Sequence, residues 1–149
     1  LNSDIQRAAA AVGQPIHLNN SYACVEGPRL GTRAESFFLR DAANCDLVGM
    51  TNLPEAFLAR EAQIAYSSLC LITDYDCWMD DPSQHVSLDK FFEVYSDTLA
   101  RAIKVLKPLV ASPFTETPSH IRQALQRALL TPREQLSRAQ QQWLEVLER

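Results

Sequence analysis

Three short polar segments of the sequence each follow an apolar run of strand length. They are residues 26–36, 49–52 and 73–78. Because open α/β sheets bind ligands at the carboxyl ends of their strands, this placement predicts that the three segments line one site. The chemistry on offer is proton transfer by carboxyl groups and anion binding by hydroxyl and backbone N–H groups.

The segment 73–78 carries two carboxylates, Asp74 and Asp76. Two residues apart in extended chain, they would face the same side. Partial burial at a strand end and the nearby second carboxylate both favour protonation of one of the pair. A protonated carboxyl group at a pocket wall can act as a general acid. The sequence leaves open the alternative that both aspartates only cap the loop at the strand exit.

Thr51 follows an apolar run and precedes a helix that we expect to begin at Pro54. Its hydroxyl and backbone N–H would lie near a helix N-terminus, where anions are favoured. The sequence also allows a purely structural role, in which Thr51 or Asn52 caps that helix.

The segment 26–36 places two glycines, a proline and two arginines close together. Glycines allow the backbone to approach a ligand closely. Arg29 and Arg33 could hold phosphate or pair with Glu26 and Glu35. For Arg33 and Glu35 we favour a structural ion pair over phosphate binding.

Composition narrows the class of protein. The chain has 149 residues, 46% hydrophobic and 21% charged, which is typical of one soluble globular domain. Its net charge of -4 argues against a nucleic-acid partner, and no apolar run approaches the ~20 residues that span a membrane. Its four cysteines lack metal-site spacing, so we expect reduced thiols, no metal and a cytoplasmic location. The start at Leu1, without a signal peptide, indicates a chain that begins inside a longer one.

Apolar runs and helix patterns alternate along the first half of the chain, which predicts an α/β fold with parallel strands. The clearest strand is the unbroken apolar run 68–73. Three strands without edge neighbours also indicate a missing partner segment. The expected strands are 22–25, 46–50 and 68–73, and the expected helices are 3–12, 33–43, 54–66, 87–108 and two that begin near residues 117 and 131.

Local signals set the expected helix ends. Gly13 stops the first helix, Thr32 caps the second, and Pro108 ends the long one. For the last helix we expect Thr131 as the cap and Glu134 as its capping-box partner.

Three ordered motifs resemble the 5'-methylthioadenosine phosphorylases, which belong to the trimeric purine-nucleoside phosphorylase family. They are EGPRLGTRAES at 26–36, GMTNLPEAFLAREA at 49–62 and TDYDCW at 73–78. The resemblance is close over residues 22–78 and looser to about residue 106. It implies a mixed, mostly parallel sheet flanked by helices. Residues 1–149 would be the C-terminal portion of a single domain, with 111–149 as its C-terminal helical segment.

The resemblance also implies an activity and partners. The activity is phosphorolysis of 5'-methylthioadenosine, giving adenine and 5-methylthioribose 1-phosphate, with inorganic phosphate as co-substrate and no metal or organic cofactor. The completed protomer would form a homotrimer. The missing N-terminal half, in the same or a separate polypeptide, would supply the glycine-containing phosphate loop and several strands.

Individual site residues follow from the same resemblance. Thr51 corresponds to a phosphate-binding threonine and Met50 to the methionine under the ribose. Asp74 corresponds to the aspartate that meets N7 and the 6-amino group of adenine, and Asp76 to its companion at the base edge or behind it. Both aspartates are therefore the expected catalytic and base-binding residues.

Other positions leave alternatives open. Leu30 stands where the family usually has a phenylalanine against the base, and Leu88 and Phe91 fall near the wall of the 5' pocket. The 6-oxopurine phosphorylases usually carry Glu and Asn where this chain has Gly31 and Asp74. An acceptor such as Asp74 suits the 6-amino group of adenine. A non-catalytic member that only binds nucleosides or assembles is the other alternative.

Overall fold

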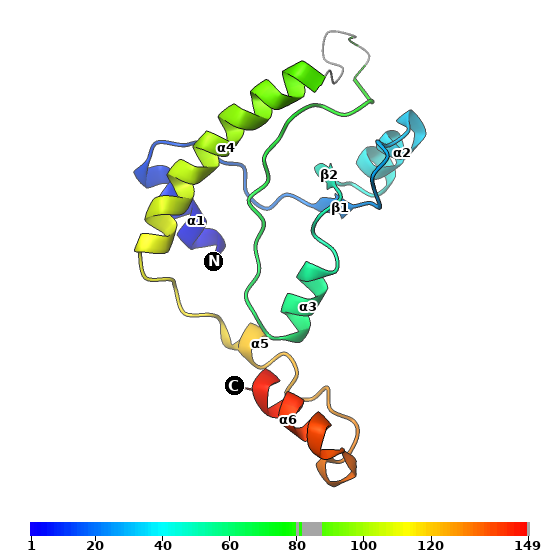
Figure 1. The fold of residues 1–149 in the computed structure, drawn as a ribbon, viewed down its shortest axis with the longest axis vertical. Helices are drawn as coiled ribbons and strands as arrows, with labels where there is room; N and C mark the ends of the chain where they lie inside the picture. The colour runs from blue at the N-terminus through cyan, green and yellow to red at the C-terminus, as the bar shows by residue number, and fades with distance from the viewer. Residues whose placement is uncertain (80, 82–87, 149) are drawn as a thin grey trace. The chain divides into compact units, whose positions relative to one another are not determined.

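The computed structural model describes residues 1–79, 81 and 88–148 (Figure 1). The chain forms two compact units. The sheet unit consists of residues 2–52 and 68–114, and the C-terminal unit consists of residues 53–67 and 115–149 together with Leu1. All three polar segments singled out above lie in the sheet unit.

A parallel strand pair forms the centre of the sheet unit. Strand β1, Tyr22–Cys24, pairs with β2, Leu47–Gly49, in a register that sets Tyr22 opposite Leu47 and Cys24 opposite Gly49. Helical chain connects the two strands, as a parallel pair requires. The expected strands at 22–25 and 46–50 and their parallel pairing are confirmed.

The third expected strand, at 68–73, is wrong for this structure. The segment carries no strand, and the sheet of the described residues has two strands only, β1 and β2. A strand needs a neighbour to satisfy its backbone hydrogen bonds, however apolar its side chains are. The side chain of Ile72 is 51% exposed, so the apolar run is not covered on both faces.

The connection between the strands begins with a short capped helix. Helix α2, Arg33–Phe37, is followed directly by the π-helical turn η1, Phe38–Ala42. The Thr32 side chain accepts a hydrogen bond from the N–H of Glu35, and the Glu35 side chain accepts one from the N–H of Thr32. The predicted cap is therefore confirmed, and the predicted helix 33–43 is present as these two consecutive elements.

The buried core of the sheet unit lies where two helices meet. Helix α1, Asn2–Ala11, contacts α4, Leu88–Ala111, and the two lie side by side in Figure 1. Gly13, at φ +65°, follows α1 and confirms the predicted stop. Among the described residues, the buried apolar side chains are Ile5, Ala8, Ala9, Val105 and Leu109.

Helix α4 continues past its expected end. Pro108 lies inside the helix, which runs on to Ala111. A proline removes one backbone donor and disfavours a helix interior. Leu109 is buried in the core, and its apolar burial offsets that cost.

The C-terminal unit consists of short helical elements. They are α3, Glu55–Glu61, α5, Ser119–Arg122, the 3-10 turn η3, Arg133–Gln135, and α6, Arg138–Leu147. Buried Gln63 connects three parts of this unit, because its amide donates to the carbonyl of Leu147 and accepts from the N–H of Leu125 at 3.0 Å. Helix α3 is shorter than the expected helix 54–66.

The last helix begins later than expected. Ser137, not Thr131, caps α6, and its capping-box partner is Gln140. Pro132 has an extended ψ of 137°, so the chain after Thr131 makes only a 3-10 turn. Two cap signals compete over a few residues here, and the one with both reciprocal hydrogen bonds starts the helix.

Candidate active site

The first two polar segments meet at one edge of the strand pair. Residues 26–36 follow β1 and residues 49–52 follow β2. Since the strands are parallel, their carboxyl ends lie at the same edge. A Cβ atom at Gly27 would lie 2.6 Å from the Met50 sulfur, so the two segments touch at this point. Glycine at position 27 is what allows the close approach.

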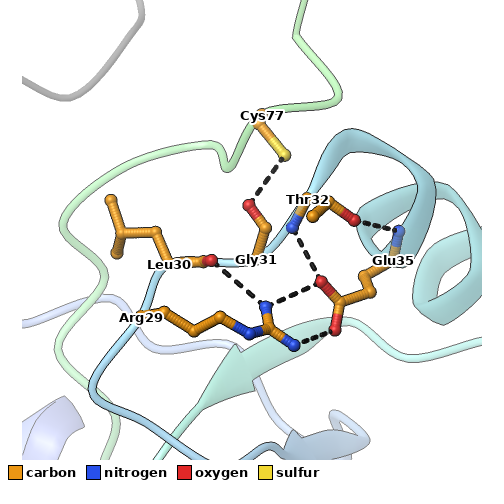
Figure 2. A network of polar contacts seen from close by, with 6 residues as sticks. All are labelled: Arg29, Leu30, Gly31, Thr32, Glu35 and Cys77. Carbon is orange, nitrogen blue, oxygen red and sulfur yellow. Dashed lines mark hydrogen bonds and ion pairs between the residues drawn. The ribbon is translucent and has the colours of Figure 1, made fainter.

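The third segment contacts the first through side chains far apart in the sequence. The Ser36 hydroxyl donates to Asp76 Oδ2 at 2.7 Å. The Cys77 thiol lies 3.9 Å from the carbonyl oxygen of Gly31, a weak S–H···O contact (Figure 2). Burial and the neighbouring Asp76 carboxylate raise the pKa of that thiol, so Cys77 is a weak donor and not a reactive thiolate.

Trp78 links the third segment to η1, which follows the first segment and α2. The guanidinium carbon of Arg40 lies 4.8 Å from the centre of the Trp78 ring and 4.9 Å from that of Phe37. Arg40 thus lies over both aromatic rings, a favourable cation–π arrangement. All three predicted segments are therefore connected, the second through Gly27 and the third through Ser36 and Cys77.

Asp76 sits in a tight turn and has both carboxylate oxygens bound. Its Oδ1 accepts from the N–H of Cys77 at 2.7 Å, and its Oδ2 accepts from Ser36. Its φ of 59° is left-handed, a conformation that aspartate adopts more readily than most residues. The chain is not extended at this point. Asp74 and Asp76 therefore lie in a turn and not on the same side of an extended chain, as the sequence predicted.

Asp74 is half-buried and accepts two hydrogen bonds from its own loop. Its Oδ1 accepts from the N–H of Asp76 at 2.9 Å, and its Oδ2 accepts from the Thr73 hydroxyl at 2.8 Å. The loop-capping contact that the sequence left open is therefore present. It also fixes the orientation of the carboxyl group, which a proton donor at a pocket wall requires.

The residues expected around the ribose, phosphate and base are open to solvent in this chain. Met50 is 37% exposed and Leu30 is 75% exposed, and Thr51 is exposed as well. Neither Thr51 nor Asn52 caps α3, because the N-cap position is Pro54. The structural alternative, in which Thr51 or Asn52 caps this helix, is therefore not supported by a cap hydrogen bond.

The 5' pocket residues lie at the start of α4. The side chain of Leu88 falls outside the described residues. Phe91 stacks on Tyr95 with ring centres 6.0 Å apart and meets Phe92 edge-on at 5.5 Å. The ring contacts of Phe91 are thus made on α4 itself.

An ion pair holds the loop that carries Leu30, as Figure 2 shows. Arg29 makes two parallel contacts with Glu35, Nη2 to Oε1 at 2.6 Å and Nη1 to Oε2 at 2.8 Å. The N–H of Thr32 donates to the same carboxylate at 2.8 Å, and Arg29 also reaches the Leu30 carbonyl at 3.2 Å. The Arg29 hydrogen bond is the main reason that the pKa of Glu35 falls to about 2. Glu35 therefore has the structural ion pair that we favoured for it, but the partner is Arg29. Arg33 lies over the Phe37 ring, with its guanidinium carbon 5.1 Å from the ring centre.

Ser36 is the residue of this site that the sequence did not single out by itself. Ser36 is 4% exposed. In the sequence it is simply the last residue of the first motif, with no role of its own indicated. Its partner Asp76 lies 40 positions later, and no local pattern signals such a pairing. Among the described residues, no three histidine, cysteine or acidic side chains come together as metal ligands would. None of the helices in that part is long and apolar enough to cross a membrane.

Comparison with known proteins gives consistent matches. The family model for the phosphorylase superfamily matches residues 1–110. The S-methyl-5'-thioadenosine phosphorylase of Geobacter sulfurreducens is 37% identical over 131 residues, which cover 88% of this chain and 45% of that protein. The enzyme of the same name from Gloeobacter violaceus is 36% identical over 151 residues, covering 99% of this chain and 49% of that protein.

Solved structures agree with the sequence matches. A methylthioadenosine phosphorylase from an antarctic soil metagenomic library superposes with a TM-score of 0.75 at 38% identity, over 97% of this chain and 51% of the other. A variant of the adenosine/methylthioadenosine phosphorylase of Schistosoma mansoni, solved with methylthioadenosine, gives 0.62 at 31% identity over 74% and 42%. The chain spans about half the length of the curated relatives it matches.

Proposed function

Since the chain belongs to the phosphorylase superfamily, we propose that the complete protomer cleaves 5'-methylthioadenosine with inorganic phosphate. The products are adenine and 5-methylthioribose 1-phosphate. The observation that carries the proposal is the contact among the three polar segments, two of which follow β1 and β2, with Asp74 fixed in its loop. The names of the relatives support the substrate.

Asp74 is the proposed general acid. Phosphate attacks C1' as the glycosidic bond stretches, the ribose becomes oxocarbenium-like, and negative charge builds on N7 of the purine. Protonated Asp74 donates to N7, and such general acid help is worth roughly 10²–10⁴ in rate. In the half-buried loop its Oδ1 is held by the N–H of Asp76, so the carboxyl group is oriented before the base arrives. No metal or organic cofactor takes part in this scheme.

The other residues have binding roles in the proposal. Thr51 binds phosphate through its hydroxyl, which no helix cap occupies. Met50 lies under the ribose, next to Gly27. Leu30 covers the base, and Leu88 and Phe91 form the apolar wall for the 5' methylthio group. Asp76 supports Asp74 at the base edge.

We further propose that the N-terminal half of the fold completes the site, in the same or another polypeptide. The described residues bury five apolar side chains, and many large ones are exposed. One such set lies along α4 at spacings of three and four residues: Phe92, Tyr95, Leu99, Ile103, Leu106 and Val110. A helix face of this kind is ordinarily covered. Residues 1–149 would then be the C-terminal part of one domain, with 111–149 as its helical end.

The complete protomer is proposed to act as a cytoplasmic homotrimer. All four cysteines are free thiols, which suits a reducing compartment. The proposed partners are a purine nucleoside and phosphate, with no nucleic acid or membrane. The net charge of -4 supports the exclusion of nucleic acid.

Adenine release tests the proposal. Methylthioadenosine and phosphate are incubated with the chain alone and with the complete protomer, and adenine is measured by chromatography. We expect phosphate-dependent adenine release from the complete protomer. We expect none from the chain alone, because Thr51 is the one phosphate ligand proposed in this chain and a single ligand is too few to bind phosphate. A complete protomer that leaves methylthioadenosine intact contradicts the proposed reaction. Cleavage of 6-oxopurine nucleosides instead would establish the alternative specificity.

A further inference from the structure

We propose that Ser36 is a positioning residue for purine recognition, which holds Asp74 in place through Asp76. The inference rests on the proposed function, because it names a residue that acts behind the base-binding carboxyl group. It assigns a role to a buried hydroxyl on α2.

The Ser36 hydroxyl makes a long-range contact with Asp76 and also interacts with the Cys77 side chain. The side chain is 4% exposed, and Oγ donates to Asp76 Oδ2 at 2.7 Å. Serine hydroxyls in helices commonly bond the carbonyl one turn back instead. Here the hydrogen bond leaves the helix and reaches a carboxylate 40 positions away. A bond to a charged acceptor is stronger than one between neutral groups.

A chain of hydrogen bonds continues from Ser36 to Asp74. Asp76 is bound by Ser36 at Oδ2 and by the N–H of Cys77 at Oδ1, which fixes the turn. The N–H of Asp76 then donates to Asp74 Oδ1 at 2.9 Å. Because Asp76 has a left-handed φ of 59°, the turn persists only while its surroundings hold it. Ser36 is the contact that ties this turn to α2.

The same helix also holds the loop that carries Leu30, the residue proposed to cover the base. Glu35, next to Ser36, binds Arg29 and the N–H of Thr32 and so fixes the loop of Leu30. That ion pair is exposed to solvent, with side-chain exposures of 62% for Arg29 and 42% for Glu35. Water can replace exposed contacts, whereas it cannot readily reach the buried Ser36 hydroxyl. Ser36 is therefore the stronger of the two links.

The test compares Ser36→Ala with Ser36→Thr in the complete protomer. We expect Ser36→Ala to lower kcat/KM for methylthioadenosine about 10- to 100-fold, since a misplacement of about 1 Å can cost that much. The KM for phosphate should change little, because phosphate does not contact Asp74 in the proposal. The kcat/KM for a 6-oxopurine nucleoside should fall less than that for methylthioadenosine, because a 6-oxopurine shares the N7 contact but has no 6-amino group for Asp74 to accept from. Ser36→Thr keeps the hydroxyl and should restore most of the activity.

Thr98→Ala is the matched control. The Thr98 hydroxyl is half-buried on α4 and bonds the Val94 carbonyl of its own helix at 2.8 Å. Removal of this hydroxyl should leave the ratio of kcat/KM for methylthioadenosine to kcat/KM for the 6-oxopurine nucleoside unchanged. If Ser36→Ala instead loosens the protein in general, kcat/KM should fall equally for both nucleosides and the KM for phosphate should rise. This result overturns the inference. Wild-type kinetics in Ser36→Ala overturn it as well.

Adenine binding separates this inference from the proposed function. Calorimetry with adenine alone needs no turnover, and Ser36→Ala should weaken binding about 10-fold. If the wild-type protomer binds adenine but turns over no nucleoside, and Ser36→Ala binds adenine more weakly, the proposed reaction fails and the role of Ser36 stands. If the protomer is active but Ser36→Ala binds adenine as the wild type does, the role of Ser36 fails and the reaction stands. A wild-type protomer with neither turnover nor adenine binding overturns both.

Discussion

Gly49, the last residue of β2, has no room for a side chain. A Cβ atom at this position would lie 1.9 Å from the Tyr22 hydroxyl oxygen and 2.6 Å from Cζ. The strand register explains the contact, because Tyr22 on β1 lies opposite Leu47, two residues before Gly49. Residues two apart on a strand share a face, so the tyrosine ring reaches over the glycine.

Gly49→Ala is therefore expected to destabilise the protein. The Tyr22 hydroxyl has to retreat from 1.9 Å to at least 3.4 Å, and the ring carbons beside it must move as well. Tyr22 is half-buried, so the ring can move, but it loses packing against the strand pair. Overpacking of this kind costs typically about 1–3 kcal/mol. With a urea m-value of about 1–3 kcal/mol/M, the unfolding midpoint should fall by roughly 1 M.

Gly31→Ala is the matched control, since a Cβ atom there meets nothing within 4 Å. Urea unfolding of both variants, followed by circular dichroism, measures the difference. We expect the midpoint of Gly31→Ala to lie at or slightly above that of the wild type. Equal midpoints for the two variants would show that Tyr22 does not lie over Gly49, and the strand register would then have to be revised.

Three further predictions concern the base-binding loop, the end of α1 and the Glu35 ion pair. Asp74→Asn should slow adenine release at least ~10²-fold and shift preference away from 6-aminopurines, and unchanged steady-state kinetics would leave Asp74 with only its loop-capping role. Gly13→Ala should lower the unfolding free energy by about 1 kcal/mol, because φ is +65°, and an unfolding curve matching that of Gly31→Ala contradicts this. The pKa of Glu35 is lowered to about 2, so its contribution to stability is present above its ordinary pKa of 4.5 and lost as pH falls toward 2. Glu35→Gln should therefore reduce the loss of unfolding free energy between pH 4.5 and pH 2. Asp97→Asn, which removes the exposed ion pair with Arg101, is the control. The prediction is refuted if the unfolding free energies of the two variants depend on pH in the same way.

Features that depend on neighbours in the sequence were predictable. The capping box joins Thr32 to Glu35 over three residues, and Gly13 stops α1 by its own backbone freedom. The parallel pairing of β1 and β2 follows from an apolar run, a helix and a second apolar run. The caps depend on residues a few positions apart, and the strand pairing depends on the order of consecutive elements along the chain.

Features that depend on distant partners were not predictable. The apolar run 68–73 has the composition of a strand, yet a strand exists only beside another, and the described residues provide none for it. Ser36 finds Asp76 across 40 positions, and α4 continues past Pro108 to Ala111, where Leu109 is buried in the core. The chemistry of each residue was visible in the sequence, but the choice of partner depends on the folded chain.

The arrangement of contacts also separates the two sides of the proposed reaction. The base side is held by contacts within the sheet unit: Ser36 to Asp76, Asp76 to Asp74, and Arg29 to Glu35. These contacts do not require further strands, because they originate from α2 and the loops beside it. The phosphate side has Thr51 as its only proposed ligand here. We therefore expect this chain to carry purine recognition, and the remainder of the fold to supply what phosphate needs.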